Sequence, residues 1–256
     1  MSRVISISNH KGGVGKTTSV VNIGAGLAYK NRKVLLIDLD PQANLTISFG
    51  VSEAEHSVYD AFSNGQDLQP INIRKNLDII PASAELAAAE IELNTETGQE
   101  SNIAKLIEPI RNNYDYIIID CPPSLGLLTL NAFAASDEVI IPIQPHFLAV
   151  KGLAKIIEVV NGIKTTLNRK VEITGVFVVM YDRRKILHQD VLDTIIMYFD
   201  DRVFKAKVRT NIALAEAPAV GQDIFEYAPE SNGAFDYGRI VNEVIEMEKK
   251  FGNKSE

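Results

Sequence analysis

The segment Asn9–Ser19, NHKGGVGKTTS, decides the fold predicted for this chain. It follows an apolar run at residues 4–8 and precedes residues 20–27, whose apolar side chains recur at helical spacing. We therefore expect a glycine-rich loop that joins a strand to a helix, which is the context that a phosphate-binding loop requires. The pattern G-x-x-x-x-G-K-[ST] ends as expected at residues 15–17, but His10 stands in place of its opening glycine.

The residue types of this loop suit a polyphosphate. The glycines at positions 12, 13 and 15 carry no Cβ, so successive backbone N–H groups can point at phosphate oxygens. The following helix adds its positive N-terminal end. We expect Lys16 to reach the terminal phosphates, the Thr17 hydroxyl to bind a magnesium ion (Mg2+), and Thr18 to donate to a phosphate oxygen. The alternative is a glycine-rich turn that only packs a strand against a helix.

The residues KGGVGKTT at positions 11–18 resemble the deviant Walker A motif of the ParA/MinD superfamily of ATPases. In that family the early lysine, here Lys11, reaches across a nucleotide-sandwich dimer to the partner's ATP. The resemblance implies an ATP-dependent homodimer, in which Gly12 lets two phosphate loops face each other closely. It makes Lys11 and Lys16 catalytic. The nucleotide-binding residues that it implies in this loop are Lys11, Gly12, Gly13, Val14, Gly15, Lys16, Thr17 and Thr18.

Length and composition limit the class of protein. With 256 residues, of which 46% are hydrophobic, we expect residues 1–256 to form a single α/β domain. The net charge of −7 argues against a surface coated in basic residues, so any contact with DNA must be local. The one cysteine excludes a disulfide framework and a cysteine cluster, and it fits a reducing cytoplasm. The sequence shows neither a signal peptide nor a membrane-spanning apolar run.

Two aspartates follow the next apolar run. Residues 33–37 are predicted to be the second strand of a β–α–β unit, and Asp38 and Asp40 lie just beyond it. Carboxylates at the C-terminal ends of parallel strands face the ligand crevice, although such an aspartate can also simply cap the next helix. The segment DLDPQAN resembles the family's second motif. The resemblance implies that Asp40 positions the attacking water and that Asp38 lies near Mg2+ through water.

A third motif lies in the middle of the chain. Residues 114–120 read as an apolar strand ending in Asp120, which is a Walker B pattern, and this carboxylate would hold the magnesium shell. A buried strand that happens to end in aspartate is the alternative. The run from residue 117 to residue 133, IIIDCPPSLGLLTLNAF, resembles the same family. Cys121 is interpreted as a core residue, since it has no second cysteine and no evident activating base.

The remaining apolar runs predict a doubly wound α/β fold, with a mostly parallel sheet of seven or eight strands flanked by helices, of the P-loop NTPase type. Further strands are expected at 77–81, 137–143 and 172–180, a helix at 84–93 and a loop at 94–102. A long helix should bury Ile156, Val159, Val160, Ile163 and Leu167. A closing helix should bury Ile240, Val244, Met247 and Phe251. His146 is interpreted as a surface or capping residue.

Two basic stretches are candidates for contact with DNA. The first follows the strand at 172–180, and the second follows the next strand-like segment. A charge run is usually only a solvated face, but an arginine at the position of Arg184 belongs to the family's nonspecific DNA-binding surface. The candidate DNA-binding residues are Arg183, Arg184, Lys185, Lys205, Lys207 and Arg209.

Residues 209–218, RTNIALAEAP, depart from a family segment that usually reads P-R-N-V-R-L-x-E-A-P. Asn211 is retained, and the resemblance places it near the adenine. Arg209 stands at the family's proline, which forms part of the wall of the base pocket. Thr210 and Ala213 stand at its two arginines, the second of which commonly contacts DNA. The sequence leaves open how the adenine pocket and the DNA-binding surface tolerate these replacements.

The resemblance covers about the whole chain and implies a partition ATPase of the ParA type. Such a protein binds ATP and Mg2+, dimerises, holds nucleoid DNA nonspecifically in the cytoplasm, and releases it after hydrolysis stimulated by a ParB-like partner. The alternative is a MinD-like positioning ATPase that acts on a membrane, which would need an amphipathic extension beyond the closing helix. The nitrogenase iron protein, another relative, needs more cysteines. The cargo, plasmid or chromosomal, and the stimulating partner stay open.

Overall fold

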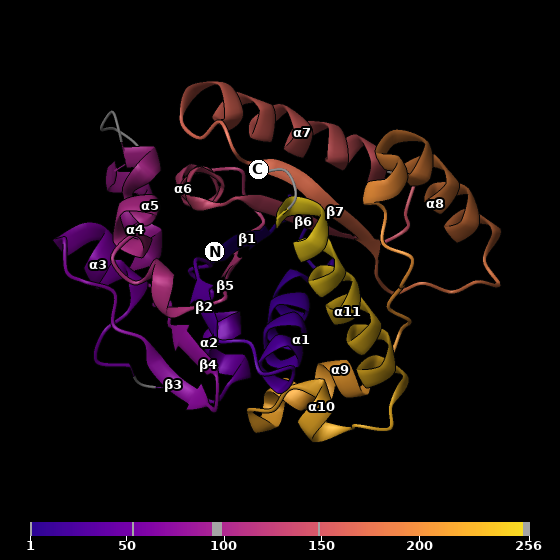
Figure 1. Ribbon diagram of the computed structural model, residues 1–256, viewed down its shortest axis with the longest axis horizontal. Coiled ribbons are helices and arrows are strands. Elements are labelled where there is room, and N and C mark those ends of the chain that lie inside the picture. Colours follow the sequence, from indigo (N-terminus) through magenta and orange to yellow (C-terminus); the bar gives the residue numbers. More distant parts are fainter. Residues whose placement is uncertain (1, 53, 94–98, 148, 253–256) are drawn as a thin grey trace.

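A seven-stranded sheet forms the centre of the molecule in the computed structural model, which describes residues 2–52, 54–93, 99–147 and 149–252 (Figure 1). The strands lie side by side in the order β3-β4-β2-β5-β1-β6-β7. Their bounds are β1 Arg3–Ile7, β2 Val34–Asp38, β3 Ile71–Arg74, β4 Leu77–Ile80, β5 Tyr116–Asp120, β6 Glu138–Ile143 and β7 Glu172–Val178. All neighbours pair in parallel except β3 with β4. The predicted doubly wound, mostly parallel α/β fold is confirmed.

The edges of the sheet differ from the prediction. The short strand β3 was not predicted, because its sequence INIR has only two apolar residues and forms a half-exposed antiparallel hairpin with β4. At the other edge, the strand-like segment expected before Lys205 forms only an isolated bridge, between Val203 and Val176, and a second isolated bridge joins Arg209 to Tyr181. The sheet therefore has the lower of the two strand numbers expected from the sequence.

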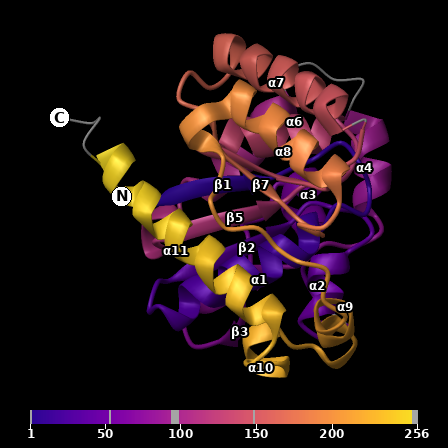
Figure 2. The ribbon, with the colours of Figure 1, turned by 90° about the vertical axis from the view of Figure 1, so that its right-hand side faces the viewer.

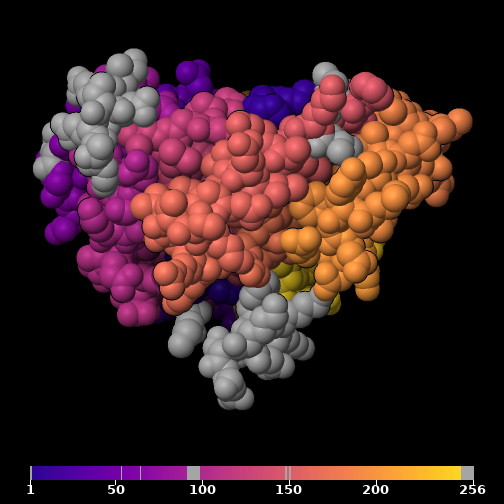
Figure 3. Space-filling model, turned by 90° about the horizontal axis from the view of Figure 1, so that it is seen from above, coloured from indigo at the N-terminus to yellow at the C-terminus, as the bar shows by residue number. Residues whose placement is uncertain are grey.

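Helices cover both faces of the sheet (Figures 1 and 2). Their bounds are α1 Lys16–Tyr29, α2 Asn44–Ser48, α3 Val58–Asn64, α4 Leu86–Leu93, α5 Asn102–Ile107, α6 Leu127–Ala135, α7 Ala149–Thr166, α8 Ile186–Phe199, α9 Ala213–Glu216, α10 Ile224–Tyr227 and α11 Asn232–Gly252. Short 3-10 turns lie at Gln99–Ser101, Arg111–Asn113, Asp200–Arg202 and Ala217–Val220. Figure 3 looks onto the side where α7 and α8 form part of the outer surface.

The core consists of two apolar layers, one on each face of the sheet. In β5, Ile117 and Ile119 belong to the layer under α3 to α8, whereas Tyr116 and Ile118 belong to the layer under α1, α2 and α9 to α11. A parallel strand covered on both faces needs apolar residues in succession rather than in alternation. This explains the near-continuous apolar runs of β1, β2 and β5, which the sequence analysis used to find them.

The closing helix α11 packs along α1 (Figure 2). A Cβ on Gly26 of α1 would lie 2.6 Å from Cγ2 of Val241, so the two helices approach as closely as they do because this residue is a glycine. Ile240 and Val244 are buried at this contact, as predicted. The side chain of Phe251 lies outside the described residues.

Two details of the helical prediction are wrong. Leu167 was expected on the buried face of the long helix, but α7 ends at Thr166 and Leu167 is exposed. The N–H groups of Leu167 and Asn168 both bond to the oxygen of Ile163, which closes the helix there. The loop expected at 94–102 extends too far, since its described part contains a 3-10 turn and the start of α5. Residues 94–98 lie outside the described residues.

Candidate functional site

The predicted phosphate loop joins the C-terminal end of β1 to the start of α1, which is the strand-to-helix context expected from the sequence. Gly13 and Gly15 have φ angles of 73° and 71°, a region that glycine enters without strain. Asn9 fixes the start of the loop. Its Nδ2 donates to the backbone oxygen of Pro142 in β6 (2.8 Å), and its Oδ1 accepts the N–H of Lys11 (3.1 Å). The motif pattern gives Asn9 no role, so its contribution is visible only in the fold.

The backbone of the loop borders open space. A Cβ placed on Gly12, Gly13 or Gly15 would meet no atom within 4 Å. Lys16 is only 7% exposed, and its Nζ donates to the backbone oxygen of Lys11 over a long 3.4 Å. Burial lowers the pKa of Lys16, whereas the neighbouring charge of Asp120 raises it. A buried ammonium beside an open cradle of glycines fits a polyanionic ligand.

Thr17 and Asp120 meet beside this cradle. The Thr17 hydroxyl donates a 2.7 Å hydrogen bond to Oδ2 of Asp120, at the end of β5. The other oxygen of this carboxylate, Oδ1, is buried and has no hydrogen-bond partner among the described residues. Burial raises the pKa of Asp120 well above its ordinary value, and the charge of Asp38 raises it further. A carboxylate oxygen without a hydrogen-bond partner and a threonine hydroxyl are oxygen donors of the kind that hard cations prefer.

Asp38 lies at the end of β2, as the Cα partner of Asp120 across the sheet. Its Oδ1 accepts the N–H of Asp40 (3.1 Å), and its Oδ2 accepts both the N–H (2.9 Å) and the hydroxyl (2.7 Å) of Thr46. Burial raises the pKa of Asp38 to about 6. Asp40 is also buried, and its Oδ1 accepts the N–H of Gln42 at 3.0 Å. Thr46 is a site residue that no sequence motif indicated.

These groups do not form a cage of protein ligands for a metal. Within the part of the chain that the structure describes, no group of three or more His, Cys, Asp or Glu side chains could hold a metal ion. Magnesium is usually bound by one or two protein groups together with phosphates and waters. Thr17 and Asp120 therefore fit a Mg2+ ion that arrives with a nucleotide, with Asp38 beside them.

Three further residues of the motifs are placed as follows. The side chain of Val14, in the middle of the loop, is buried. The backbone oxygen of Thr18 accepts a 2.7 Å hydrogen bond from Nδ2 of Asn22, one turn further along α1. Cys121 is fully buried, as predicted for a core residue, and burial raises the pKa of its thiol to about 12.

The structure brings the two basic stretches together at one end of β7. Tyr181 pairs with Arg209 in a parallel bridge, and Nζ of Lys207 lies 5.8 Å from the centre of the Tyr181 ring. Arg183 and Lys185 are exposed at the start of α8, and Lys205 is exposed before Lys207. The sequence alone could not place the two stretches on one surface.

Two of these cations are held by carboxylates. Arg184 makes a two-pronged contact with Asp182, at 3.0 and 2.9 Å. Arg209 makes a similar contact with Asp236 of α11, at 2.9 and 2.7 Å, and Asp236 is 4% exposed. Part of the charge of these two arginines is therefore neutralised by carboxylates of the same chain.

Asn211 and Ala213 belong to one turn that leads into α9. Oδ1 of Asn211 accepts the N–H of Ala213 at 2.9 Å. Ala213 is 8% exposed and belongs to the apolar layer under α1 and α11. The methyl group at this position is therefore a packing residue, which explains why alanine is suitable here.

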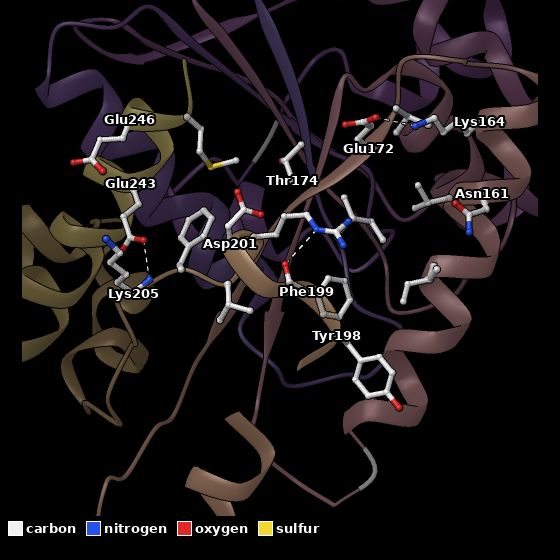
Figure 4. A pocket seen from close by; sticks show the side chains of 18 residues that line it. Asn161, Lys164, Glu172, Thr174, Tyr198, Phe199, Asp201, Lys205, Glu243 and Glu246 are labelled. Atoms are coloured by element: carbon white, nitrogen blue, oxygen red, sulfur yellow. Dashed lines mark hydrogen bonds and ion pairs between the residues drawn. The ribbon is translucent and has the colours of Figure 1, made fainter. Parts of the chain in front are cut away.

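A separate groove of about 980 Å³ lies between α7, β7 and α11 (Figure 4). Its walls include Lys164, Glu172, Tyr198, Lys205 and Glu243, and no residue of the phosphate loop lines it. The N–H groups of Lys205 and Ala206 donate to Glu243 there. This groove is thus distinct from the cradle.

Among the described helices, none combines the length and apolar character that crossing a membrane would require.

The chain matches known proteins over nearly all of its length. A family model described as an AAA domain matches residues 2–173. The sporulation initiation inhibitor protein Soj of Bacillus subtilis is 45% identical over 95% of this chain and 98% of its own length. The chromosome-partitioning ATPase Soj of Treponema pallidum is 39% identical over 96% and 98%. A cobyrinic acid a,c-diamide synthase of Mycobacterium smegmatis, solved with an ATP analogue and magnesium, superposes with a TM-score of 0.85 at 30% identity over 97% and 96%.

Proposed function

Since this chain belongs to the ParA/Soj family of partition ATPases, we propose that it is a Mg2+-dependent ATPase that segregates plasmid or chromosomal DNA. Residues 1–256 would act as one ATPase domain. The observation that carries this proposal is the pair Thr17 and Asp120 beside the cradle of glycines, in which one buried oxygen of Asp120 has no hydrogen-bond partner in the described part of the chain. Both features favour a bound magnesium nucleotide.

Each residue of the site has a role in this proposal. The N–H groups of residues 12–18 and Nζ of Lys16 bind the phosphates, while Thr17 and Asp120 hold Mg2+, with Asp38 reached through water. Asp40 orients the attacking water, and Asn211 contacts the adenine. Lys11 is exposed at the mouth of the loop, which suits contact with the ATP of a second copy. A bound magnesium ion supplies charge neutralisation for the transferred phosphate.

The proposed cycle also needs a matrix and a partner. The ATP-bound homodimer would hold duplex DNA nonspecifically through the basic end of β7, and a ParB-like protein would stimulate hydrolysis and release. In this proposal the protein acts on the nucleoid in the cytoplasm. The juxtaposition of Lys207 with Tyr181 supports a shared basic surface there.

The test compares three matrices under the same conditions. The purified protein is incubated with duplex DNA of arbitrary sequence, with anionic liposomes, or alone, each with ATP and Mg2+, with ADP, or without nucleotide. Sedimentation reports binding, and phosphate release reports hydrolysis. ATP-dependent, salt-sensitive binding to DNA with slow hydrolysis is the expected result. ATP-dependent sedimentation with liposomes instead of DNA would favour the MinD-like alternative, and absence of Mg2+-dependent hydrolysis would refute the ATPase itself.

A further inference from the structure

Both ends of the segment from Asp38 to Thr46 donate hydrogen bonds to the carboxylate of Asp38. The N–H of Asp40 donates to Oδ1 of Asp38, and the N–H and hydroxyl of Thr46 donate to its Oδ2 at 2.9 and 2.7 Å. Asp38 is fully buried and Thr46 is 5% exposed. These hydrogen bonds to an ionised group are shielded from water, and they close the segment into a loop.

The same hydroxyl also ties this loop to a second strand. Oγ1 of Thr46 accepts the N–H of Ala82 at 3.0 Å, just beyond the end of β4. Ala82 is 7% exposed. One threonine therefore joins β2, α2 and the segment after β4, using both the donor and the acceptor capacity of its hydroxyl.

Asp40 lies inside this closed loop. Its backbone oxygen accepts the N–H of Ala43 at 2.8 Å, and its carboxylate accepts the N–H of Gln42. Ala43 has a φ angle of 52°, which is a left-handed conformation that costs energy in alanine. A turn containing such a residue persists when its surroundings hold it, and here the hydrogen bonds at Asp38 hold both of its ends.

We infer that Thr46 is a positioning residue for ATP hydrolysis, which acts by fixing the loop that carries Asp40. This inference rests on the proposed ATPase activity. In this role Thr46 would contact neither the nucleotide nor the attacking water, because its hydroxyl is engaged with Asp38 and Ala82. Its hydroxyl holds the C-terminal end of the segment that carries Asp40 against Asp38 and Ala82, and small displacements of a group that orients a nucleophile slow the reaction steeply.

Two variants of Thr46 separate the effect of the hydroxyl from that of the bulk of the side chain. Thr46→Val keeps the shape but loses both hydrogen bonds of the hydroxyl, whereas Thr46→Ser keeps the hydroxyl and loses only the methyl group. The control is Thr174→Val in β7. Thr174 is 6% exposed and likewise donates to a carboxylate, Glu138, at 2.9 Å, but it lies at the opposite edge of the sheet from the loop.

The experiment measures kcat and KM for ATP hydrolysis, the affinity for ATP in a direct titration, and the thermal midpoint of each variant. Thr46→Val should lower kcat at least about tenfold while ATP affinity changes little, because the hydroxyl orients the loop and does not contact ATP. Thr46→Ser should restore most of kcat. Thr174→Val should lower the thermal midpoint without lowering kcat.

The outcomes distinguish this inference from the proposed function. If the parent protein fails to hydrolyse ATP, the proposed function is wrong and this inference falls with it. If the parent hydrolyses ATP and Thr46→Val retains its kcat, only the positioning role is wrong. A loss of kcat in Thr46→Ser equal to that in Thr46→Val would also overturn it. Should Thr46→Val not fold, Thr46→Cys takes its place, since a thiol has similar size but donates weakly.

Discussion

Asp38 and Asp120 end two neighbouring strands as direct Cα partners, and both side chains are fully buried. Burial raises the pKa of each carboxyl group, and the charge of Asp38 raises the pKa of Asp120 further. Asp38 accepts from backbone and hydroxyl donors, whereas Asp120 accepts from Thr17 on one oxygen, and its second oxygen has no hydrogen-bond partner among the described residues. The protein without ligand therefore keeps an electrostatic cost that a bound cation would remove.

The first prediction concerns the electrostatic cost of the buried Asp120 carboxylate. Asp120→Asn should stabilise the nucleotide-free protein by about 1 kcal/mol, because it removes a buried charge without changing the shape of the side chain. The same change should weaken Mg2+ binding in the presence of ATP by roughly 10- to 100-fold. Denaturant unfolding without nucleotide and a Mg2+ titration with ATP measure the two effects. Asp193→Asn, an exposed carboxylate on α8, is the control and should change neither.

The two effects should have opposite signs, since Asp120→Asn is expected to raise the stability of the nucleotide-free protein and to lower its affinity for Mg2+. A variant that loses stability and keeps the Mg2+ dependence of the parent would show that Asp120 is only a structural partner of Thr17.

The second prediction separates the two lysines of the phosphate loop. Lys16 is buried beside the cradle, so Lys16→Ala should weaken ATP binding roughly 10- to 100-fold through loss of a charge-assisted contact. Lys11 is exposed, so Lys11→Ala should leave ATP binding by the monomer close to normal and reduce ATP-dependent dimerisation. Nucleotide titration and light scattering distinguish the two effects. Lys30→Ala, at the exposed end of α1, is the control. Equal loss of ATP binding in both lysine variants would contradict a role across the dimer.

The third prediction concerns Asp40. A carboxylate that orients water acts on hydrolysis more than on nucleotide affinity, so Asp40→Ala should bind ATP and persist as a dimer with near-zero turnover. Asp40→Asn keeps the acceptor for the N–H of Gln42 and isolates the effect of the charge. Turnover and dimer lifetime are measured together. Hydrolysis by Asp40→Ala at the parent rate would show that Asp40 only supports the structure of the loop and does not orient the attacking water.

The sequence predicted the parts of the fold and site that local patterns specify. Continuous apolar runs revealed the buried strands, and the loop at residues 11–18 and the aspartates after β2 and β5 lie together at one end of the sheet. The pattern could not reveal Thr46 or Asn9, because their roles depend on backbone atoms of Ala82 and Pro142, which lie far away in the sequence. Edge strand β3 was missed since one half-exposed hairpin carries too few apolar residues.

The fourth prediction concerns pH. Nδ1 of the buried His188 accepts the N–H of Asp182 at 3.1 Å, which requires a neutral imidazole. Burial lowers the pKa of His188, and Lys185 lowers it further, against the opposing charge of Asp182. The unfolded chain therefore binds this proton more readily, so the free energy of unfolding should fall as the pH drops below the ordinary histidine pKa of about 6.5.

The measurement is the pH dependence of denaturant unfolding between about pH 5 and pH 8, the range in which histidine titrates. His188→Asn places an uncharged acceptor where Nδ1 lies and should flatten the loss at acid pH. His56→Gln, which replaces an exposed histidine, should not. An unchanged pH profile in His188→Asn would assign the acid sensitivity to other groups.

The last prediction concerns the basic end of β7. Arg183 and Lys185 are exposed, whereas Arg209 is bound to Asp236, so the three cations should not contribute alike to DNA binding. Each phosphate neutralised adds about 0.9 to the slope of log affinity against log salt, and a dimer carries each cation twice. The double variant Arg183→Ala/Lys185→Ala should therefore lower the salt slope by up to roughly 3 to 4.

Two single variants, Arg209→Ala and Lys75→Ala, serve as controls for this prediction. Arg209→Ala should lower thermal stability more than DNA affinity, because it leaves the 4% exposed carboxylate of Asp236 without its partner. Lys75→Ala removes an exposed cation from the β3–β4 turn at the opposite edge of the sheet and should change neither property. DNA binding across a salt series is measured beside ATP-dependent dimerisation, which all variants should retain. An unchanged salt slope in the double variant would place the DNA-binding surface elsewhere, because charges that contact phosphate cannot be removed without reducing counterion release.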